Sequence, residues 1–390
     1  MSFLQSLVSA FKGETARVPL SRTYTSPWAF AEVAPGRAPF EYTGAVIRAY
    51  LDNPVAQRAV RLVAEGIAGA PLVSADDRLT ALIRATSAGQ SLLETLASHL
   101  LLHGNGYVQI VKDAKGRPVE LFALRPERMS VLAGPDGWPT AYMYKVGEQR
   151  LSLPVLDEDA SPALIHVRHF HPADDHYGAG CLAAADQAIA THNAAAHWNR
   201  QLLENAARPS GALVYGAGDA AALTADQFDR LRDELARAFA GSANAGRPML
   251  LEGGLTWQAM GMTPADMDFA TLKAAAARDI ALAFGVPPML LGLPGDATYA
   301  NYREANRALW RLTLLPLAAK ILGALGEGLE TWFPGRSLAV DLDRVPALAE
   351  DRERLWAQVG AAGFLDDDEK RGLLGLPPRP EPQKQDGENI

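Results

Sequence analysis

The sequence predicts an α+β protein in which a mixed first half is followed by a largely helical second half. Three observations carry this prediction. Short alternating segments separated by glycine-containing turns recur between 107 and 167, which is typical of strands. Two alanine-rich helices, 181–207 and 263–284, then bracket a small module with both strand and helix signals. The chain of 390 residues is 48% hydrophobic, which suits a sizeable core divided over two or three domains.

Composition excludes several classes of protein. The net charge of -8 gives no overall positive field for gripping DNA or an anionic membrane. The single cysteine, Cys181, excludes an intramolecular disulfide framework and fits a reducing cytosol. Residues 1–12 lack the features of a signal peptide, and the most apolar window, 280–293, is too short and too rich in glycine and proline to span a bilayer. We therefore expect no membrane partner.

The first half begins with an arm and continues into helices and strands. Residues 13–42 are rich in proline, glycine and arginine without periodicity, which favours an extended arm lying on a neighbour. Apolar spacing after Asn53 predicts a helix that ends at the turn 69–71, and a second helix covers 91–103. The predicted strands are 107–111 and 120–124, joined by a turn at 115–116, followed by 142–146 and 164–167.

The second half starts with a helix at 181–207 that has ten alanines and no glycine or proline, so it extends about 40 Å. The compact insert that follows shows a strand at 212–215, a helix opened by a capping box of Thr224 with Gln227, and two strands joined at 253–254. Thr263 and Pro264 then open the second alanine-rich helix.

The remaining chain holds a long loop and a third helix. Residues 285–301 are rich in glycine and proline and end in small polar residues, and long loops of this kind are usually functional. The helix at about 302–333 contains Pro316, which predicts a kink. A strand at 337–342 and two short helices follow, and Asp366 with Glu369 predicts a capping box at a helix N-terminus. A tail of disordered composition completes the chain.

One histidine-rich stretch invites a metal-dependent hydrolase as an alternative function. Histidines and carboxylates can hold a metal ion, but strand alternation divides these side chains between two faces. The stretch also lacks the HExxH pattern of zinc hydrolases. A strand end and a polar turn explain it better, so we expect no metal there. Its members are His166, His169, His171, Asp174, Asp175 and His176.

Other candidate sites have simpler structural explanations. Cys181 begins a helix, where the dipole could activate a thiol, but a small residue in an alanine-rich helix more often serves packing. The glycine pairs at 104–106 and 178–180 lack the surroundings of a phosphate-binding loop. Nothing assembles a catalytic constellation, so we expect a protein that is not an enzyme and binds no cofactor.

Taken together, six segments resemble, in their order and spacing, the portal proteins of tailed bacteriophages, of the long-tailed-phage type that includes gene transfer agent portals. The resemblance spans Gly44 to Pro378. The family's Gly-x-Ser-Pro-Leu at the head of the first stem helix reads Gly178-Ala179-Gly180-Cys181-Leu182 here, a weaker cap. The segments are NPVAQRAVRLVAEGIAGAPL, LLHGNGYVQIVKDAKGRPVELFALRPERM, LIHVRHFHPADDHYGAGCL, NAGRPMLLEGGLTWQAMGMTPADMDF, AFGVPPMLLGLP and DDDEKRGLLGLPP.

The resemblance implies a homododecameric ring at one vertex of the head of a virion or gene transfer agent particle, assembled in the bacterial cytoplasm. Double-stranded DNA would be packaged and ejected through the ring, which also connects head to tail. Implied partners are the major capsid protein, the large terminase as packaging motor, and the head–tail adaptor. A ring-forming connector without a packaging role is the other alternative.

The resemblance also implies a division of the chain. Its parts are an N-terminal arm (1–42), a wing (43–180), a stem helix (181–207), a clip (208–262), a second stem helix (263–284), a tunnel loop (285–301), a kinked helix with a second part of the wing (302–345), a crown (346–376) and a disordered tail (377–390).

Simple geometry agrees with a DNA conduit. Twelve helices spaced about 10 Å apart enclose a lumen of ~27 Å, which passes a duplex with little clearance. At -8 per chain, twelve copies carry about -96, and an acidic wall avoids the phosphate contacts that make DNA stick. The tunnel loop would meet the duplex with small polar residues, and any attraction would come from isolated cations nearby. The expected DNA-facing residues are Asp296, Ala297, Thr298, Tyr299, Asn301, Lys273 and Arg303.

Overall fold

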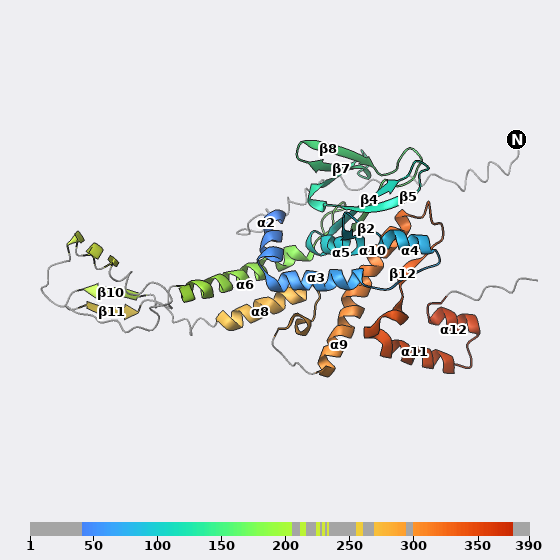
Figure 1. Ribbon diagram of the computed structural model, residues 1–390. Helices are drawn as coiled ribbons and strands as arrows, with labels where there is room; N and C mark the ends of the chain where they lie inside the picture. Colours follow the sequence, from blue (N-terminus) through green and yellow to red (C-terminus); the bar gives the residue numbers. More distant parts are fainter. Residues whose placement is uncertain are drawn as a thin grey trace, which may run out of the picture.

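The computed structural model describes residues 41–204, 211–215, 224–226, 228–230, 232–233, 255–259, 269–293 and 299–376. The predicted arm up to residue 40, the tail 377–390, the capping residues Thr263 and Pro264 and most of the insert 208–262 lie outside the described residues. Figure 1 shows a mixed body from which two long helices extend side by side, with a strand pair beyond their free ends.

Two small antiparallel sheets build one part of the body (Figure 1). The first has the strand order β5-β4-β9 and the second is a meander in the order β6-β7-β8. The strands are β4 (Asn105–Lys112), β5 (Pro118–Leu124) and β9 (Leu164–Arg168), then β6 (Met129–Ala133), β7 (Pro139–Val146) and β8 (Gln149–Pro154). The sequence predicted β4, β5, β7 and β9. It did not reveal β8, where Leu153 alone is buried, because a mostly exposed edge strand shows little apolar alternation.

The helical core of the body lies beneath the first sheet and brings both halves of the chain together. Helices α3 (Pro54–Ala68), α5 (Leu92–Leu102) and α10 (Leu315–Gly328) contact one another. Their facing side chains are buried at helical spacing, as expected for amphipathic helices around a common core. The most deeply buried members are Val63, Leu96, Leu100, Ile321 and Leu325, each 0% exposed.

The C-terminal half returns to the first half through a short sheet and a tryptophan. Strand β1 (Leu72–Ser74) pairs antiparallel with β12 (Leu338–Val340). The indole nitrogen of Trp332 donates a hydrogen bond of 2.7 Å to the carbonyl of Gly116 in the β4–β5 turn. These contacts explain why segments far apart in sequence form one body.

Smaller elements complete the described chain. Helix α12 begins with the capping box that the sequence predicted, because Asp366 accepts from the amide of Glu369 and the Glu369 carboxylate accepts from the amide of Asp366. The elements are α2 (Tyr42–Val46), the π-helix η2 (Ile47–Leu51), α4 (Asp77–Arg84), β2 (Thr86–Ser87), β3 (Gln90–Ser91), α11 (Ala349–Ala361) and α12 (Asp367–Leu373).

The third long helix starts earlier and is interrupted differently from the prediction. Helix α9 (Tyr299–Leu309) runs into the π-helix η6 (Trp310–Leu314) and then into α10. The proline ring of Pro316 would clash with the carbonyl four residues before it, and a widened π turn relieves this clash. The continuous segment Ala300–Gly328 is long and apolar enough to cross a membrane by length and composition, but its α10 part is a core helix of the body.

Candidate functional site

The two long helices are the most distinctive feature of the molecule and define the candidate site. Helix α6 (Cys181–Glu204) and helix α8 (Phe269–Ala283) pack antiparallel along their length (Figure 1). Helix α6 buries one residue every three or four positions, at Leu182, Ala185, Ile189 and His192. Its many alanines leave a slim surface, so a neighbouring helix can approach closely.

A strand pair lies at the free end of the two helices. Strand β10 (Gly211–Tyr215) pairs antiparallel with β11 (Leu255–Ala259). Near this end the rings of Trp198 and Phe269 lie 5.9 Å apart and join α6 to α8. The proposed hairpin at 253–254 lies outside the described residues.

Asn53 attaches the body to α6 and has all of its side-chain hydrogen-bonding groups in use. Its Oδ1 caps α3 by accepting from the amides of Val55 and Ala56 at 3.0 and 2.9 Å. Its Nδ2 lies 3.1 Å from Nδ1 of His192 and 2.8 Å from Oδ1 of Asn193. An amide nitrogen can only donate, so His192 accepts and stays neutral. The pKa of His192 is lowered, first by burial and then by the charge of Lys273 on α8.

Helix α8 ends in a Schellman motif that fixes the direction of the following chain. The amide of Val286 donates to the carbonyl of Ala281, and the amide of Gly285 donates to that of Leu282. Gly285 has the positive φ of 65° that this motif requires. The hydroxyl of Thr313 in η6 donates to the carbonyl of Gly285 at 2.6 Å. The exit from α8 is therefore pinned to the π-helix.

The predicted loop 285–301 is shorter in the structure. Pro288–Leu291 form the 3₁₀-helix η5, and the side chains of Leu290 and Leu291 pack against the core. Tyr299 and Asn301 belong to α9 and not to a loop, because the helix begins at Tyr299. Residues Asp296, Ala297 and Thr298, the centre of the predicted DNA-facing group, lie outside the described residues.

Lys273 and Arg303, the two cations predicted near the tunnel loop, lie in different surroundings. Lys273 is half-buried between α8 and α6 near His192. The guanidinium of Arg303 pairs with Glu350 of α11 at 2.9 Å, so it is not the isolated charge that the sequence suggested. Arg307, one turn further along α9, pairs with the same carboxylate at 2.7 Å. The spacing of Arg303 and Arg307 shows in the sequence that they share one helix face, but not that their partner lies on α11.

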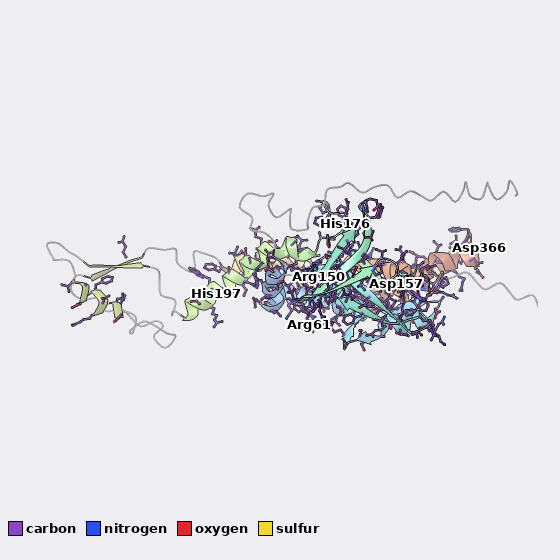
Figure 2. All side chains as sticks on the ribbon, turned by 90° about the horizontal axis from the view of Figure 1, so that it is seen from above. Arg61, Arg150, Asp157, His176, His197 and Asp366 are labelled. Atoms are coloured by element: carbon purple, nitrogen blue, oxygen red, sulfur yellow. The ribbon has the colours of Figure 1, made fainter. Side chains whose placement is uncertain are left out.

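The histidine-rich stretch is occupied by local contacts. The ring of His166 stacks on Tyr107 with centroids 4.3 Å apart. Nδ1 of His171 accepts from the amide of Ala173, and Asp174 accepts from the amides of His176 and Tyr177 in a turn. Within the described ranges, no three histidine, cysteine or carboxylate side chains are grouped so that they could hold a metal ion. Figure 2 shows His176 on the body and His197 far along α6.

We expect elemental analysis of the purified protein to find no stoichiometric zinc or manganese at this stretch. The His166 ring is stacked on Tyr107, and His171 Nδ1 and Asp174 Oδ1 already accept from backbone amides. Among the described residues, no three side chains of this stretch are grouped as an ion would require. A stoichiometric metal that is lost on His169→Ala and His171→Ala replacement, but kept in a His197→Ala control, would contradict this expectation.

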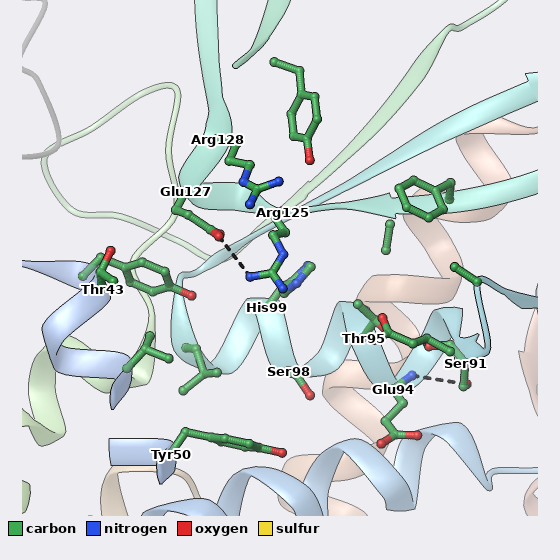
Figure 3. Close-up of a pocket in the computed structure, with 18 of the residues that line it drawn as sticks. Thr43, Tyr50, Ser91, Glu94, Thr95, Ser98, His99, Arg125, Glu127 and Arg128 are labelled. Atoms are coloured by element: carbon green, nitrogen blue, oxygen red, sulfur yellow. Dashed lines mark hydrogen bonds and ion pairs between the residues drawn. The ribbon is translucent and has the colours of Figure 1, made fainter. Parts of the chain in front are cut away.

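A hollow of about 730 Å³ lies between α2, α5 and β5. Figure 3 shows Arg125 beside His99 and joined to Glu127, with which it forms an ion pair of 3.5 Å. Burial lowers the pKa of His99 to about 4, so this ring is neutral at pH 7. The Nδ1 of His99 makes no hydrogen bond to the protein's described part. Nucleophilic catalysis needs a hydroxyl or thiol in contact with a base. Among the described residues, Nδ1 of His99 has no such partner.

Comparison with known proteins identifies the class. The family model for phage portal proteins matches residues 54–375, and the chain belongs to this family. An uncharacterised protein of Rickettsia felis is 38% identical over 349 residues, covering 85% of this chain and 89% of the relative. A protein of Streptomyces phage phiC31, described as a probable portal protein, is 26% identical and covers 74% of this chain and 64% of its own length.

Similar solved structures come from gene transfer agent particles and from a phage portal protein. A chain in the virion of a native gene transfer agent particle is 46% identical, with a TM-score of 0.67 covering 97% of this chain and all of that one. A chain from the neck of a native gene transfer agent particle, computed with C12 symmetry, is 49% identical with a TM-score of 0.66, covering 87% and 94%. An HK97-family phage portal protein from Corynebacterium diphtheriae, 18% identical with a TM-score of 0.57, shares the fold.

Proposed function

We propose that this chain is the portal protein of a gene transfer agent or a tailed-phage particle. Twelve copies form a ring at one vertex of the head, through which double-stranded DNA is packaged and ejected, and the ring connects head to tail. The observation that carries the proposal is the 46% identity to a gene transfer agent virion chain over 97% of this chain. The neck structure computed with C12 symmetry supports the number of copies.

The architecture supports a division into portal parts. The antiparallel pair α6 and α8 forms the stem, and the β10–β11 pair beyond its free end belongs to the clip. The two sheets with α3, α5 and α10 form the wing, and α11 with α12 forms the crown. The ion pairs from Arg303 and Arg307 to Glu350 then join the kinked helix to the crown.

The charged side chains near the stem suit a channel wall that binds the DNA duplex weakly. Arg303 pairs with Glu350, and Arg307 pairs with Glu304, Glu350 and Asp351. Lys273 is half-buried near His192. Charges engaged in this way contact phosphates only weakly, which keeps friction low. The major capsid protein, the large terminase and the head–tail adaptor are the partners that such a ring requires, the last two binding at the clip.

We propose no catalytic activity for this protein. The family is structural, and the histidine stretch is explained by turns and ring stacking. A metal-dependent hydrolase and a connector without a packaging role are therefore the weaker alternatives.

Deleting residues 296–299 should leave ring assembly intact and impair packaging or retention of DNA. The deletion lies between η5 and the body of α9, so the packed Leu290, Leu291 and Leu309 side chains stay in place. The measurement is the amount of nuclease-protected DNA in particles carrying the variant, compared with ring yield by electron microscopy. Replacing residues 296–298 by Gly-Ser-Gly at constant length is the matched control for loop length.

Particles of the deletion variant that fill and hold DNA normally would contradict a role for this segment in handling the genome. Loss of the ring itself would instead assign the segment to assembly.

A further inference from the structure

Two leucine side chains on one side of the molecule are largely exposed to solvent, although leucine is usually buried. Leu282 near the end of α8 is 79% exposed, and Leu312 in the π-helix η6 is 77% exposed. Both line a hollow of about 240 Å³. The other residues that line it are Arg278, Gly285, Val286, Pro287, Pro288 and Ala308. An apolar surface of this kind usually marks a contact with another molecule.

This surface is held in a fixed shape. Its floor is the Schellman motif at Gly285, and Thr313 bonds the carbonyl of that glycine. The next residue, Leu314, is buried against Gly66 of α3. With Thr313 and Leu314 directed inward, Leu312 is left on the outside. A preformed surface loses little conformational entropy when a partner binds.

A second apolar surface lies on the π-helix η2, on the other side of the stem helices from Leu282 and Leu312. The π-helix η2 directly precedes α3 and packs against α3 and α6, whereas Leu314 of η6 packs at Gly66, near the other end of α3. Figure 1 accordingly shows α2 on one side of α6 and α9 on the far side of α8. At the η2 end, Ile47 is 45% exposed and Leu51 is 69% exposed. The chain thus carries one apolar surface on each side of the stem.

The charges beside the two surfaces are complementary. Exposed Arg311 precedes Leu312, and exposed Asp52 follows Leu51. Neither charge forms an ion pair with another residue in the described ranges. Copies that each carry -8 repel one another, so a contact between copies gains from local pairing of opposite charges.

We propose that the Leu282–Leu312 surface of one copy packs against the Ile47–Leu51 surface of the next copy, with Arg311 facing Asp52. This inference rests on the proposed ring. A closed ring needs a heterologous contact, in which two different surfaces of the chain meet, and these two surfaces lie on opposite sides of the stem. The leucines provide the buried apolar centre and the charges set the register.

Leu312→Glu and Leu282→Glu should each raise the protein concentration needed for half-maximal ring assembly by about tenfold or more, because a carboxylate would be buried at the centre of the contact. The measurement is ring yield by mass photometry across a concentration series. Leu151→Glu, at another exposed leucine on β8, is the matched control and should assemble as the unchanged chain does. Thermal unfolding of the monomers should be unchanged, since both leucines are exposed there.

Cross-linking tests the pairing directly. In a Cys181→Ala background, Leu51→Cys with Leu312→Cys should give a ladder of disulfide-linked copies on oxidation, and either cysteine alone should give none. Arg311→Asp should weaken assembly, and adding Asp52→Arg should restore it.

The possible failures are distinguishable. If the unchanged chain forms rings but the glutamate variants assemble equally well, or the double-cysteine rings do not cross-link, the two surfaces are not the contact and the ring stands. If the unchanged chain forms no ring, the proposed function itself fails, and the inference with it.

Discussion

Gly178→Ala should leave almost no stably folded protein. A Cβ at Gly178 would overlap the carbonyl oxygen of Gly104 and lie 2.7 and 2.8 Å from the backbone nitrogen and oxygen of His169. All three obstacles are backbone atoms, in the turn after α5 and directly after β9, so they cannot rotate away. We expect a loss of more than about 4 kcal/mol in the free energy of unfolding, measured by urea denaturation.

The reason is that two glycine-containing turns pack directly against each other. Gly104 has a φ of 86°, and a Cβ there would meet Gly178 O and Gly180 N, both at 2.5 Å. Asn105, 1% exposed, joins the two turns by accepting from the amide of Gly178 at 2.8 Å and donating to its carbonyl at 3.2 Å. These glycines are structural, as their surroundings in the sequence predicted.

Gly360→Ala is the matched control. Gly360 lies in α11 with open space around its missing Cβ, so alanine should be neutral or stabilise the protein by up to about 1 kcal/mol. Normal stability of the Gly178→Ala protein would contradict the close packing of the two turns.

Acidification from pH 7 to pH 5 should destabilise the protein strongly. Burial lowers the pKa of His103 to about 4 and that of His166 to about 3, and His99 in the same region behaves like His103. Unfolded histidines titrate near pH 6.5, so between pH 6.5 and 4 the unfolded state binds more protons than the folded state. Stability therefore falls as pH decreases, by about 1 to 2 kcal/mol per histidine at pH 5.

Asn105 gives this effect a structural cause. Its Nδ2 donates to Nδ1 of His103 at 3.1 Å, and its Oδ1 accepts from Nε2 of His166 at 3.1 Å. An amide nitrogen cannot accept, so protonating Nδ1 of His103 breaks the first bond. Urea unfolding at pH 7, 6 and 5 measures the slope. His103→Gln should reduce the slope by about one proton. Equal stability at pH 7 and pH 5 would contradict neutral buried histidines.

Local signals in the sequence predicted much of the fold. The α12 capping box, the β4–β5 hairpin and the end of α8 at Gly285 follow from short-range chemistry, and the structure confirms them. The π-helix before Pro316 was predicted only as a kink, because the sequence shows the obstacle and not the way the backbone avoids it.

Tertiary contacts were harder to predict. The sequence shows that a helix follows Asn53, but the bonds of Asn53 to His192 and Asn193 join residues about 140 positions apart. Arg303 looked isolated because its partner, Glu350, lies 47 positions away. The start of α9 at Tyr299 was missed because Tyr299 and Asn301 have modest helix propensity, which packing against η5 overrides.

The central claim is that copies of this chain close into a ring around a channel for DNA. Electron microscopy of the purified full chain at increasing concentration tests it most directly. We predict closed rings with twelve-fold symmetry and a central opening of ~27 Å, the width that twelve stem helices about 10 Å apart enclose. Monomers at every concentration, open filaments, or rings without a central opening would contradict the claim.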